Sequence, residues 1–311
     1  MTAVPDVGGV HAGTGAFAEV HEARPAMSSS ARINAQISAG TAEVLTLEQV
    51  CERARGGLPT GVDLVTLAFP VAISGSAAVF VVPIAGRGVF TRAERISING
   101  IPGHPGPAPN ERLGVVDTLI FADERRLDDR NYDGASLFLE LLQGRVVEAE
   151  CHSVEGTTHR NAFALKAVDF ARFYVYNASL PAGAASIRYL RDALVPGTRI
   201  VLNGSQGIIV GPGTRDRPDA MALSITADMQ DMDADLMSSE GGRPRHVVAC
   251  ALPVRDVATI AQLVEWTGSA AGEALSCPAA LRAATGLQQL IQKGQFQLSE
   301  TGPIDAKPAE T

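Results

Sequence analysis

Long hydrophobic runs and clustered cysteines are both missing from this chain of 311 residues. No apolar stretch reaches the roughly 18–20 residues of a membrane-spanning helix, because charged, proline and small polar residues interrupt the longest candidate, residues 62–84. The first 30 residues lack the apolar core of a signal peptide. The four cysteines lie far apart without a C-x-x-C pair, which argues against a disulfide framework or a structural zinc site and favours a reducing compartment. We therefore expect a cytoplasmic protein.

Positive charge is also scarce. The 26 Lys and Arg residues are outnumbered by 34 Asp and Glu residues, and the formal net charge is −8. A chain of this kind without a clustered basic face is a poor candidate for binding nucleic acid or an anionic membrane. The low charged fraction of 19% and the 31 glycines fit a compact, loop-rich enzyme. The expected partner is a small-molecule substrate.

The common cofactor and nucleophile motifs are absent as well. The stretch Gly204-Ser205-Gln206-Gly207 lacks the Lys-Ser/Thr ending of a P-loop. The spacing G-x-G-x-x-G follows none of the expected strands, and no serine lies in a G-x-S-x-G elbow. His152 and His159 could approach each other across a hairpin, but nothing supplies an obvious third ligand. We predict no cofactor and no metal.

What the sequence does contain is a series of short strands and helices joined by glycine turns. Residues 46–57 combine a Thr46/Gln49 capping box with a Gly-Gly stop, which predicts a helix over 47–55. Further helices are expected at 134–143, 187–193, 256–265 and 278–293. Strands are expected at 64–69, 77–83, 95–99, 115–122, 146–152, 161–170, 221–227 and 246–252, with two more around a glycine turn within 198–214. The glycine- and proline-rich residues 100–106 are expected to form a loop.

This pattern predicts an α+β fold, a mixed-sheet single body with short glycine turns and peripheral helices. The body is expected to span residues 31–298. Residues 1–30 and 299–311 lack periodicity and are predicted to be a mobile extension and a mobile tail.

Three segments gather small and polar residues where strands end, which is where rigid scaffolds expose chemistry. They are Ser74-Gly75-Ser76, His104 within its glycine- and proline-rich segment, and Thr157-Thr158-His159-Arg160. Taken singly, each is more simply an ordinary turn.

Taken in order, segments along the chain resemble the homocysteine-biosynthesis (HcyBio) domain family. They are residues 32–37, 42–46, 62–66, 98–102, 132–134, 140–145, 197–207 and 228–233. The most specific segment is 197–207, which is similar to the family's G-T-R-I-F-L-G-G-G-x-G, and the resemblance covers about residues 32–294.

The resemblance implies sulfur chemistry. Family members, often fused to CBS and ferredoxin-like domains, convert aspartate semialdehyde to homocysteine, and cysteines are thought to pass the sulfur. A thiolate suits that role because it is a strong nucleophile at neutral pH. Because a single folded domain accounts for the length of this chain, we expect a family member without the CBS and ferredoxin-like domains.

The departures from the family pattern are chemically important. The position of the family's first cysteine, in G-P-M-C-S-S-G-A, is occupied by Ala72, and the second, in T-D-C-Y-P-R, falls at Thr157-Thr158. Neither alanine nor threonine carries sulfane sulfur. The family's Y-G-G-G-H becomes Tyr132-Asp133-Gly134-Ala135-Ser136, which loses a histidine and gains a carboxylate. The chain between residues 177 and 197 is shorter than the family leads us to expect, so one side of the pocket is expected to be remodelled.

Cys151 lies a few residues before the second of these positions. It could replace the missing thiol, or strand alternation could point it into the core, and we favour the core.

Three functions follow from this comparison. The first is a repurposed enzyme of specialised metabolism that keeps the family pocket for a small amino-acid or carbonyl substrate and uses non-thiol acid–base chemistry. The second is a sulfur-incorporating enzyme that uses Cys151 or free sulfide. The third is a catalytically silent binding subunit. An α+β body with a glycine-rich rim is also compatible with a homodimer whose site lies near the interface.

The candidate catalytic residues are His104, Asp133, Cys151 and His159. The candidate substrate-binding residues are Ser74, Gly75, Ser76, Tyr132, Thr157, Thr158, Arg160, Gly204, Ser205, Gln206 and Gly207. If the protein is the repurposed enzyme, we expect Arg160 to bind a substrate carboxylate. Backbone amides of the turns 74–76 and 204–207 are then expected to bind an oxyanion.

Overall fold

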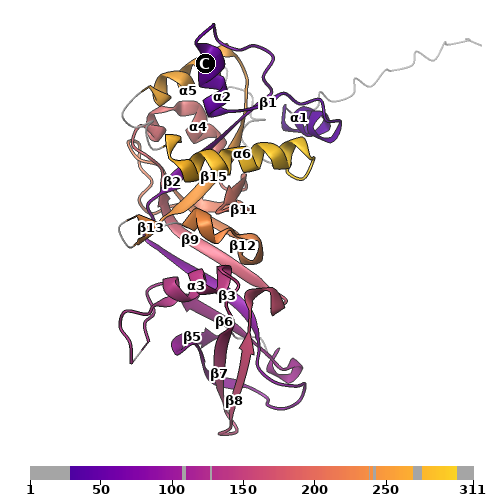
Figure 1. Ribbon diagram of the computed structural model, residues 1–311, viewed down its shortest axis with the longest axis vertical. Helices are drawn as coiled ribbons and strands as arrows, with labels where there is room; N and C mark the ends of the chain where they lie inside the picture. The colour runs from indigo at the N-terminus through magenta and orange to yellow at the C-terminus, as the bar shows by residue number, and fades with distance from the viewer. Residues whose placement is uncertain are drawn as a thin grey trace, which may run out of the picture.

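The computed structural model describes residues 29–106, 110–126, 128–237, 239–240, 243–268 and 275–299. The extension predicted for residues 1–30 and the tail predicted for 299–311 lie almost wholly outside the described residues. The described part of the chain is elongated, with helices gathered at one end and a β-hairpin at the other (Figure 1).

Among the described residues, the main elements are six α-helices and one large sheet, which confirms the predicted α+β fold. The helices are α1 (Ser29–Ser38), α2 (Leu47–Ala54), α3 (Gly134–Leu142), α4 (Arg188–Ala193), α5 (Val257–Thr267) and α6 (Pro278–Gln292). The strands of the first half are β1 (Val44–Thr46), β2 (Leu64–Val71), β3 (Gly75–Pro83), β4 (Ala93–Ile98), β5 (Ile101–Pro105) and β6 (Val115–Phe121). The later strands are β7 (Val147–Ser153), β8 (Thr158–Phe163), β9 (Ala171–Ser179), β10 (Arg199–Leu202), β11 (Ser205–Pro212), β12 (Ala222–Asp228) and β15 (His246–Pro253). Two short strands, β13 (Ser239–Glu240) and β14 (Arg243–Pro244), pair only with each other.

The large sheet has 13 strands in the order β1-β2-β15-β10-β11-β12-β9-β3-β6-β5-β4-β7-β8. The pair β1–β2 is parallel, and the other strand pairs of the sheet are antiparallel. β2 and β15 are almost completely buried, because they lie between two hydrophobic cores, one on each face of the sheet.

The first half of the sheet curls back on itself. His246 on β15 lies with its ring centroid 5.5 Å from that of Phe173 on β9, although three strands separate β15 from β9 in the sheet. Beyond the end of β2, Ala72 forms an isolated bridge with Ser179 on β9. The chain therefore passes from one partner strand to another between β2 and β3, and this crossing builds the site described below.

Helices cover this sheet unevenly. α6 packs on β2 and β15 through Ala280, Leu287 and Ile291, in a core shared with Ile33 and Ile37 of α1. α3 packs on the second half of the sheet, where Phe138 contacts Phe80 and Phe173. None of the described helices is long and apolar enough to cross a membrane.

Local signals explain most helix ends. Thr46 and Gln49 form the predicted capping box at the start of α2, and Gly144 and Gly294 follow α3 and α6 with φ of 76° and 69°. Such positive φ values favour glycine, which ends a helix without steric cost.

Two expectations were wrong. Residues 101–105 form strand β5 rather than a loop, because Gly103 lets the chain approach β6 closely: a Cβ there would lie 2.6 Å from Cγ2 of Thr118. The single strand expected over 161–170 is also incorrect. β8 ends at Phe163, a 3-10 turn covers Leu165–Ala167, and the chain then enters β9, which had no counterpart among the expected strands.

Candidate functional site

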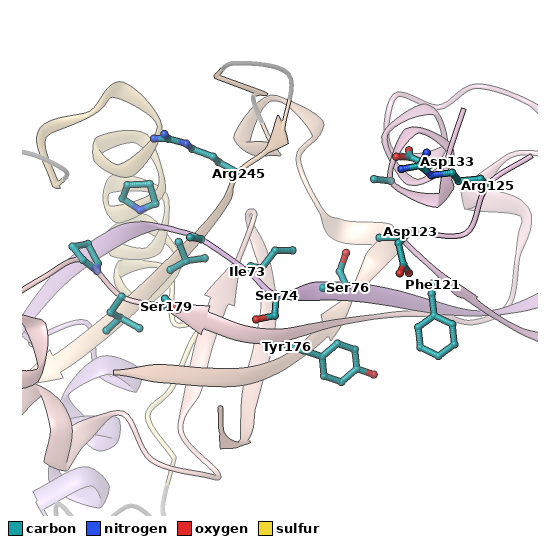
Figure 2. A pocket seen from close by; sticks show the side chains of 18 residues that line it. Ile73, Ser74, Ser76, Phe121, Asp123, Arg125, Asp133, Tyr176, Ser179 and Arg245 are labelled. Carbon is teal, nitrogen blue, oxygen red and sulfur yellow. The ribbon is translucent and has the colours of Figure 1, made fainter. Parts of the chain in front are cut away.

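A cavity of about 780 Å³ lies where the chain crosses from β2 to β3. Its floor and walls include Val71, Ala72 and Ile73, with Ser74-Gly75-Ser76 following. Figure 2 shows these residues between Arg245 on one side and Asp123, Arg125 and Asp133 on the other. This volume lies in the range typical of small-molecule sites.

The crossing itself exposes the backbone and side chains that line the cavity. β2 is paired with β15 up to Val71, and β3 is paired with β9 from Gly75 onward. In between, Ser179 N donates to Ala72 O over 2.8 Å and Ser74 N donates to Tyr176 O over 3.0 Å. The residues between the two ladders are therefore held in place while their side chains are free to face the cavity.

One rim of the cavity is built where β6 ends and α3 begins. Ala122 N donates to Ser76 O, and Ala135 N donates to Ala122 O, so the segment after β6 is fixed to both β3 and α3. Gly134 permits this approach, because a Cβ there would lie 2.2 Å from Phe121 O. The result is that Asp123, Arg125 and Asp133 share one rim.

Asp133 has a structural role as well as its place on the rim. It is the N-cap of α3, and its Oδ1 accepts from Ser136 N over 2.9 Å and from Ser136 Oγ over 2.8 Å. Oδ2 accepts none of the hydrogen bonds found among the described residues, so one carboxylate oxygen remains for a ligand.

The opposite rim is anchored by a buried pair of polar residues next to Arg245. Asn203 Nδ2 lies 2.8 Å from His246 Nδ1, while Asn203 Oδ1 accepts from Val247 N over 2.9 Å. Because the amide oxygen is engaged by a donor, the amide nitrogen donates to Nδ1, and the imidazole carries its proton on Nε2. Burial lowers the pKa of His246 to about 4. The start of β15, and with it Arg245, is thus held by a neutral histidine.

Four of the candidate residues line this cavity: Ser74, Gly75, Ser76 and Asp133. His104 on β5 lies beside it, outside the lining. Its ring is edge-on to Phe121 at 5.8 Å, and its Nε2 lies 3.1 Å from Glu124 Oε1. The proposed amide of Ser74 is already bonded to Tyr176, so it is not available to an oxyanion.

The candidates Thr157, Thr158, His159 and Arg160 lie elsewhere, on the β7–β8 hairpin at the far end of the molecule (Figure 1). His159 stacks on Phe90 at 5.0 Å and its Nε2 lies 2.9 Å from Thr157 Oγ1. Thr158 Oγ1 lies 2.9 Å from Nδ1 of His152.

Arg160 donates to Glu150, and this pairing lowers the pKa of the Glu150 carboxyl. These residues bond to one another and not to the cavity.

Tyr132 does not line the main cavity. It contacts Asn99 and Arg126, which line a separate, open groove of about 380 Å³. Its hydroxyl donates to Glu140 Oε2 over 2.6 Å, and burial together with this carboxylate raises the pKa of Tyr132 to about 12.

The segment Gly204-Ser205-Gln206-Gly207 does not line the cavity. The turn between β10 and β11 is Asn203-Gly204, and residues 205–207 lie on β11. Asn203 and Gly204 adopt φ of 48° and 87°, as a two-residue hairpin requires. Gly207 is needed because a Cβ would lie 2.5 Å from Thr226 O. Ser205 is buried, and Gln206 Nε2 donates to Gln295 O. The segment's role here is to fix the sheet.

Cys151 is buried on β7 between β4 and β8. Burial, and then the nearby Glu111 carboxylate, raise the pKa of its thiol to about 11. The thiol is therefore protonated at neutral pH, and Cys151 is not among the residues that line the cavity, as expected of a core cysteine. In the part of the chain that the structure describes, no three His, Cys, Asp or Glu side chains come together as a metal site would require.

The family model for "Homocysteine biosynthesis enzyme, sulfur-incorporation" matches residues 42–178 and 190–266. The chain belongs to the HcyBio family. The match excludes α1 and α6, so it is shorter than the resemblance read from the sequence. It is also interrupted between residues 178 and 190, and the interruption contains Leu180 and Pro181, which line the cavity. The break falls within the segment where the sequence predicted remodelling.

Two curated relatives come from methanogenic archaea. An uncharacterized protein of Methanothermobacter thermautotrophicus is 31% identical over 239 residues, which cover 64% of this chain and 56% of the relative. An uncharacterized protein of Methanocaldococcus jannaschii is 31% identical over 208 residues, which cover 56% of this chain and 51% of the relative. The chain thus spans about half the length of the curated relatives it matches. No solved structure matches it.

The HcyBio cysteine positions named from the sequence lie in different places. Ala72 is exposed and lines the cavity, whereas Thr157 and Thr158 are on the distant hairpin. Ala72, the position to which the resemblance assigns the family's first cysteine, is therefore the one of the two that lines the cavity.

Sequence reasoning missed Asp123, Arg125, Tyr176 and Arg245, all of which line the cavity. The strand-end argument applied to 74–76 would have found three of them, because Asp123 and Arg125 follow β6 directly and Arg245 precedes β15. The strand-end argument could not have found Tyr176, because it lies within β9, which was not expected as a strand.

Proposed function

We propose that this HcyBio member is an enzyme that binds a small amino-acid or carbonyl substrate in the cavity between β2 and β3 and acts by acid–base chemistry without a thiol relay. One observation carries the proposal. Ala72 lines a cavity that has both carboxylates and guanidinium groups on its rims, and the described residues of its lining include no cysteine.

The charges on the rims indicate the class of substrate. Arg245 on one side and Arg125 on the other each offer the forked donor that binds a carboxylate. Asp123 and Asp133, beside Arg125, offer oxygens to an ammonium group. An amino acid or amino-acid aldehyde carries both charges, and the floor made by Val71, Ala72 and Ile73 suits its short aliphatic part.

The acid–base groups in this proposal are the two carboxylates of the rim. Oδ2 of Asp133 is held in place by the cap bonds of Oδ1, which gives the rigidity that a general base needs. Asp123 lies on the same rim and is exposed. His104 contacts the wall residue Phe121 and reaches Glu124, so it borders the site without lining it. Arg160, assigned a clamping role from the sequence, is replaced in that role by Arg125 and Arg245.

The buried thiols do not support a sulfur relay. Cys151 and Cys250 are both fully buried, and burial raises the pKa of each thiol. Because the thiolate is the nucleophile, neither residue is set up to hold or pass sulfur. A reaction that used free sulfide would need no thiol and would take place in the same cavity.

Binding can be tested by thermal denaturation with a panel of amino acids, amino-acid semialdehydes and simple carbonyl compounds. A ligand present at a hundred times its dissociation constant adds about 2.7 kcal/mol to the free energy of unfolding. We expect at least one amino-acid-like compound to raise the melting temperature. Arg125→Met and Arg245→Met should each weaken that shift, whereas Arg160→Met, on the distant hairpin, should leave it unchanged.

The same panel of compounds also distinguishes the proposed enzyme from a silent binding subunit and tests where the site lies. If no compound shifts the melt, the proposal fails and a silent binding subunit is the better account. If Arg160→Met weakens binding as much as the two rim variants do, the site lies on the hairpin and not in the cavity.

A further inference from the structure

The strand registers place a set of apolar side chains on one face of the sheet formed by β5, β6, β3, β9, β12 and β11. In one row across these strands Phe121, Ala77, Tyr174, Thr226 and Ile208 lie opposite one another in turn. The next row contains His104, Leu119, Val79, Arg172 and Asp228. Directly opposite residues of antiparallel strands point to the same face, so both rows lie on one surface. We call it the outer face.

Flanking positions extend these rows at both ends. Tyr176 lies opposite Gly75, and Val81 lies opposite Asp117. Val81 N also donates to Phe170 O, which continues the β3–β9 ladder by one residue pair. Figure 2 shows the rings of Phe121 and Tyr176 together on one side of the strands, while Arg125, Asp133 and Arg245 lie on the other.

The outer face combines apolar and aromatic side chains with a few charged ones, and it is partly open. Phe121, Phe170 and Tyr176 are 36%, 46% and 42% exposed. Arg172 is held flat on it by a hydrogen bond from Nε to Thr226 Oγ1. The side chains of α3 that reach this part of the sheet do so from the other side, where Phe138 meets Phe80 and Phe173. Tyr, Phe and Arg are the residues enriched where proteins bind one another.

The size of the outer face fits a second copy of the chain. With strands about 4.8 Å apart and same-face residues repeating about every 6.8 Å, each position covers about 33 Å², so the rows and flanking positions named above give roughly 500 Å² of flat area. Two such faces bury roughly 1,000 Å² in total, which is at the lower limit for a specific interface.

The pattern is also compatible with twofold symmetry. A twofold axis parallel to β3 would place β6 of one copy over β9 of the other, so that Leu119 faces Arg172 and Val79 faces Val79. The edge residues are then complementary too, with His104 of one copy over Asp228 of the second copy.

We propose that the outer face is the interface of a homodimer in which two sheets pack face to face. Phe121 and Tyr176 belong to the outer face and also line the cavity, so the second copy covers one side of the site. The proposal does not depend on which substrate the cavity binds, because it is tested by mass alone.

The test is sedimentation velocity of the full chain from about 1 to about 100 micromolar, which covers the weak end of the affinities found for protein interfaces. We expect a species of twice the monomer mass of 32.5 kDa to dominate at the upper end. The double variant Phe170→Glu/Tyr174→Glu, which puts two charges on the outer face and leaves the cavity lining intact, should sediment as a monomer throughout. Val146→Glu is the matched control, because Val146 is 68% exposed and lies just before β7, away from the outer face.

Circular dichroism of each variant establishes that it is folded. If the double variant fails to fold, Phe170→Glu alone, at a position already 46% exposed, provides the same comparison. A wild-type chain that stays monomeric at every concentration overturns the proposal. So does a folded outer-face variant that remains as dimeric as Val146→Glu.

Discussion

Lowering the pH from about 7.5 to about 5 should destabilise this protein by about 2 kcal/mol through His246 alone. The imidazole is fully buried and accepts a hydrogen bond from Asn203, and its pKa falls from 6.5 to about 4. Between these two values the unfolded chain binds a proton that the folded chain does not bind. The contribution of His246 to the free energy of unfolding is therefore fully present above pH 6.5, decreases as the pH falls, and is lost below about pH 4. The full difference, about 2.5 pKa units, corresponds to roughly 3 kcal/mol.

The assay is urea denaturation of the wild type and of His246→Gln at a series of pH values. Glutamine offers an amide oxygen to Asn203 and gains no proton in this range. The variant is therefore expected to be less stable than the wild type near neutral pH and to lose less stability on acidification. The difference between the two curves isolates His246 from the carboxyl groups that titrate at lower pH. If both proteins lose stability with the same slope between about pH 7.5 and about pH 5, the imidazole is not held neutral and the account of this rim is wrong.

Two further predictions concern the scaffold that positions the cavity. Gly134→Ala should cost at least about 2 kcal/mol of stability, because the new Cβ would lie 2.2 Å from Phe121 O, whereas Gly286→Ala in the open middle of α6 should gain about 1 kcal/mol. Equal effects in chemical denaturation would contradict the close approach of α3 to β6. Thr46→Ala removes the hydroxyl that accepts from Gln49 N over 3.2 Å and should cost about 1 kcal/mol, while Thr46→Ser should retain most of the stability. A serine variant as unstable as the alanine variant would show that the methyl group, and not the cap, matters at this position.

Much of the fold followed from local signals in the sequence. The capping box at Thr46, the helix stops at Gly144 and Gly294, and the hairpin around Gly204 each depend on a few neighbouring residues, so they could be predicted. β5 could not, since its glycine and proline content is typical of a loop, and only contact with β6 explains why Gly103 is required. β9 is a different case, because its buried residues Ala171, Phe173 and Val175 alternate with more exposed ones; this period-2 pattern was present in the sequence and was missed when the strand was expected over residues 161–170.

The site was recoverable only in part for a related reason. Ser74-Gly75-Ser76 was identified as a polar segment at a strand end and Asp133 as a departure from the family pattern, and both line the cavity. The hairpin residues 157–160 satisfied the same rule, and no local feature distinguishes them from the cavity residues. What separates the two groups is the crossing from β2 to β3, which depends on β9 and β15 lying on either side of it, far along the sequence.

Our central proposal is that the cavity between β2 and β3 binds a small substrate and that Ala72 stands where the family resemblance puts a cysteine. The most direct test is to incubate the wild type and Ala72→Cys with a persulfide donor and to map sulfane sulfur on each cysteine by peptide mass spectrometry. We predict no sulfur on Cys151 of the native protein and stable labelling at the new cysteine of the variant, because residue 72 is exposed and lines the cavity. Sulfane sulfur on Cys151 of the folded wild type, passed on to a small carbonyl acceptor and abolished in Cys151→Ala, would contradict the account.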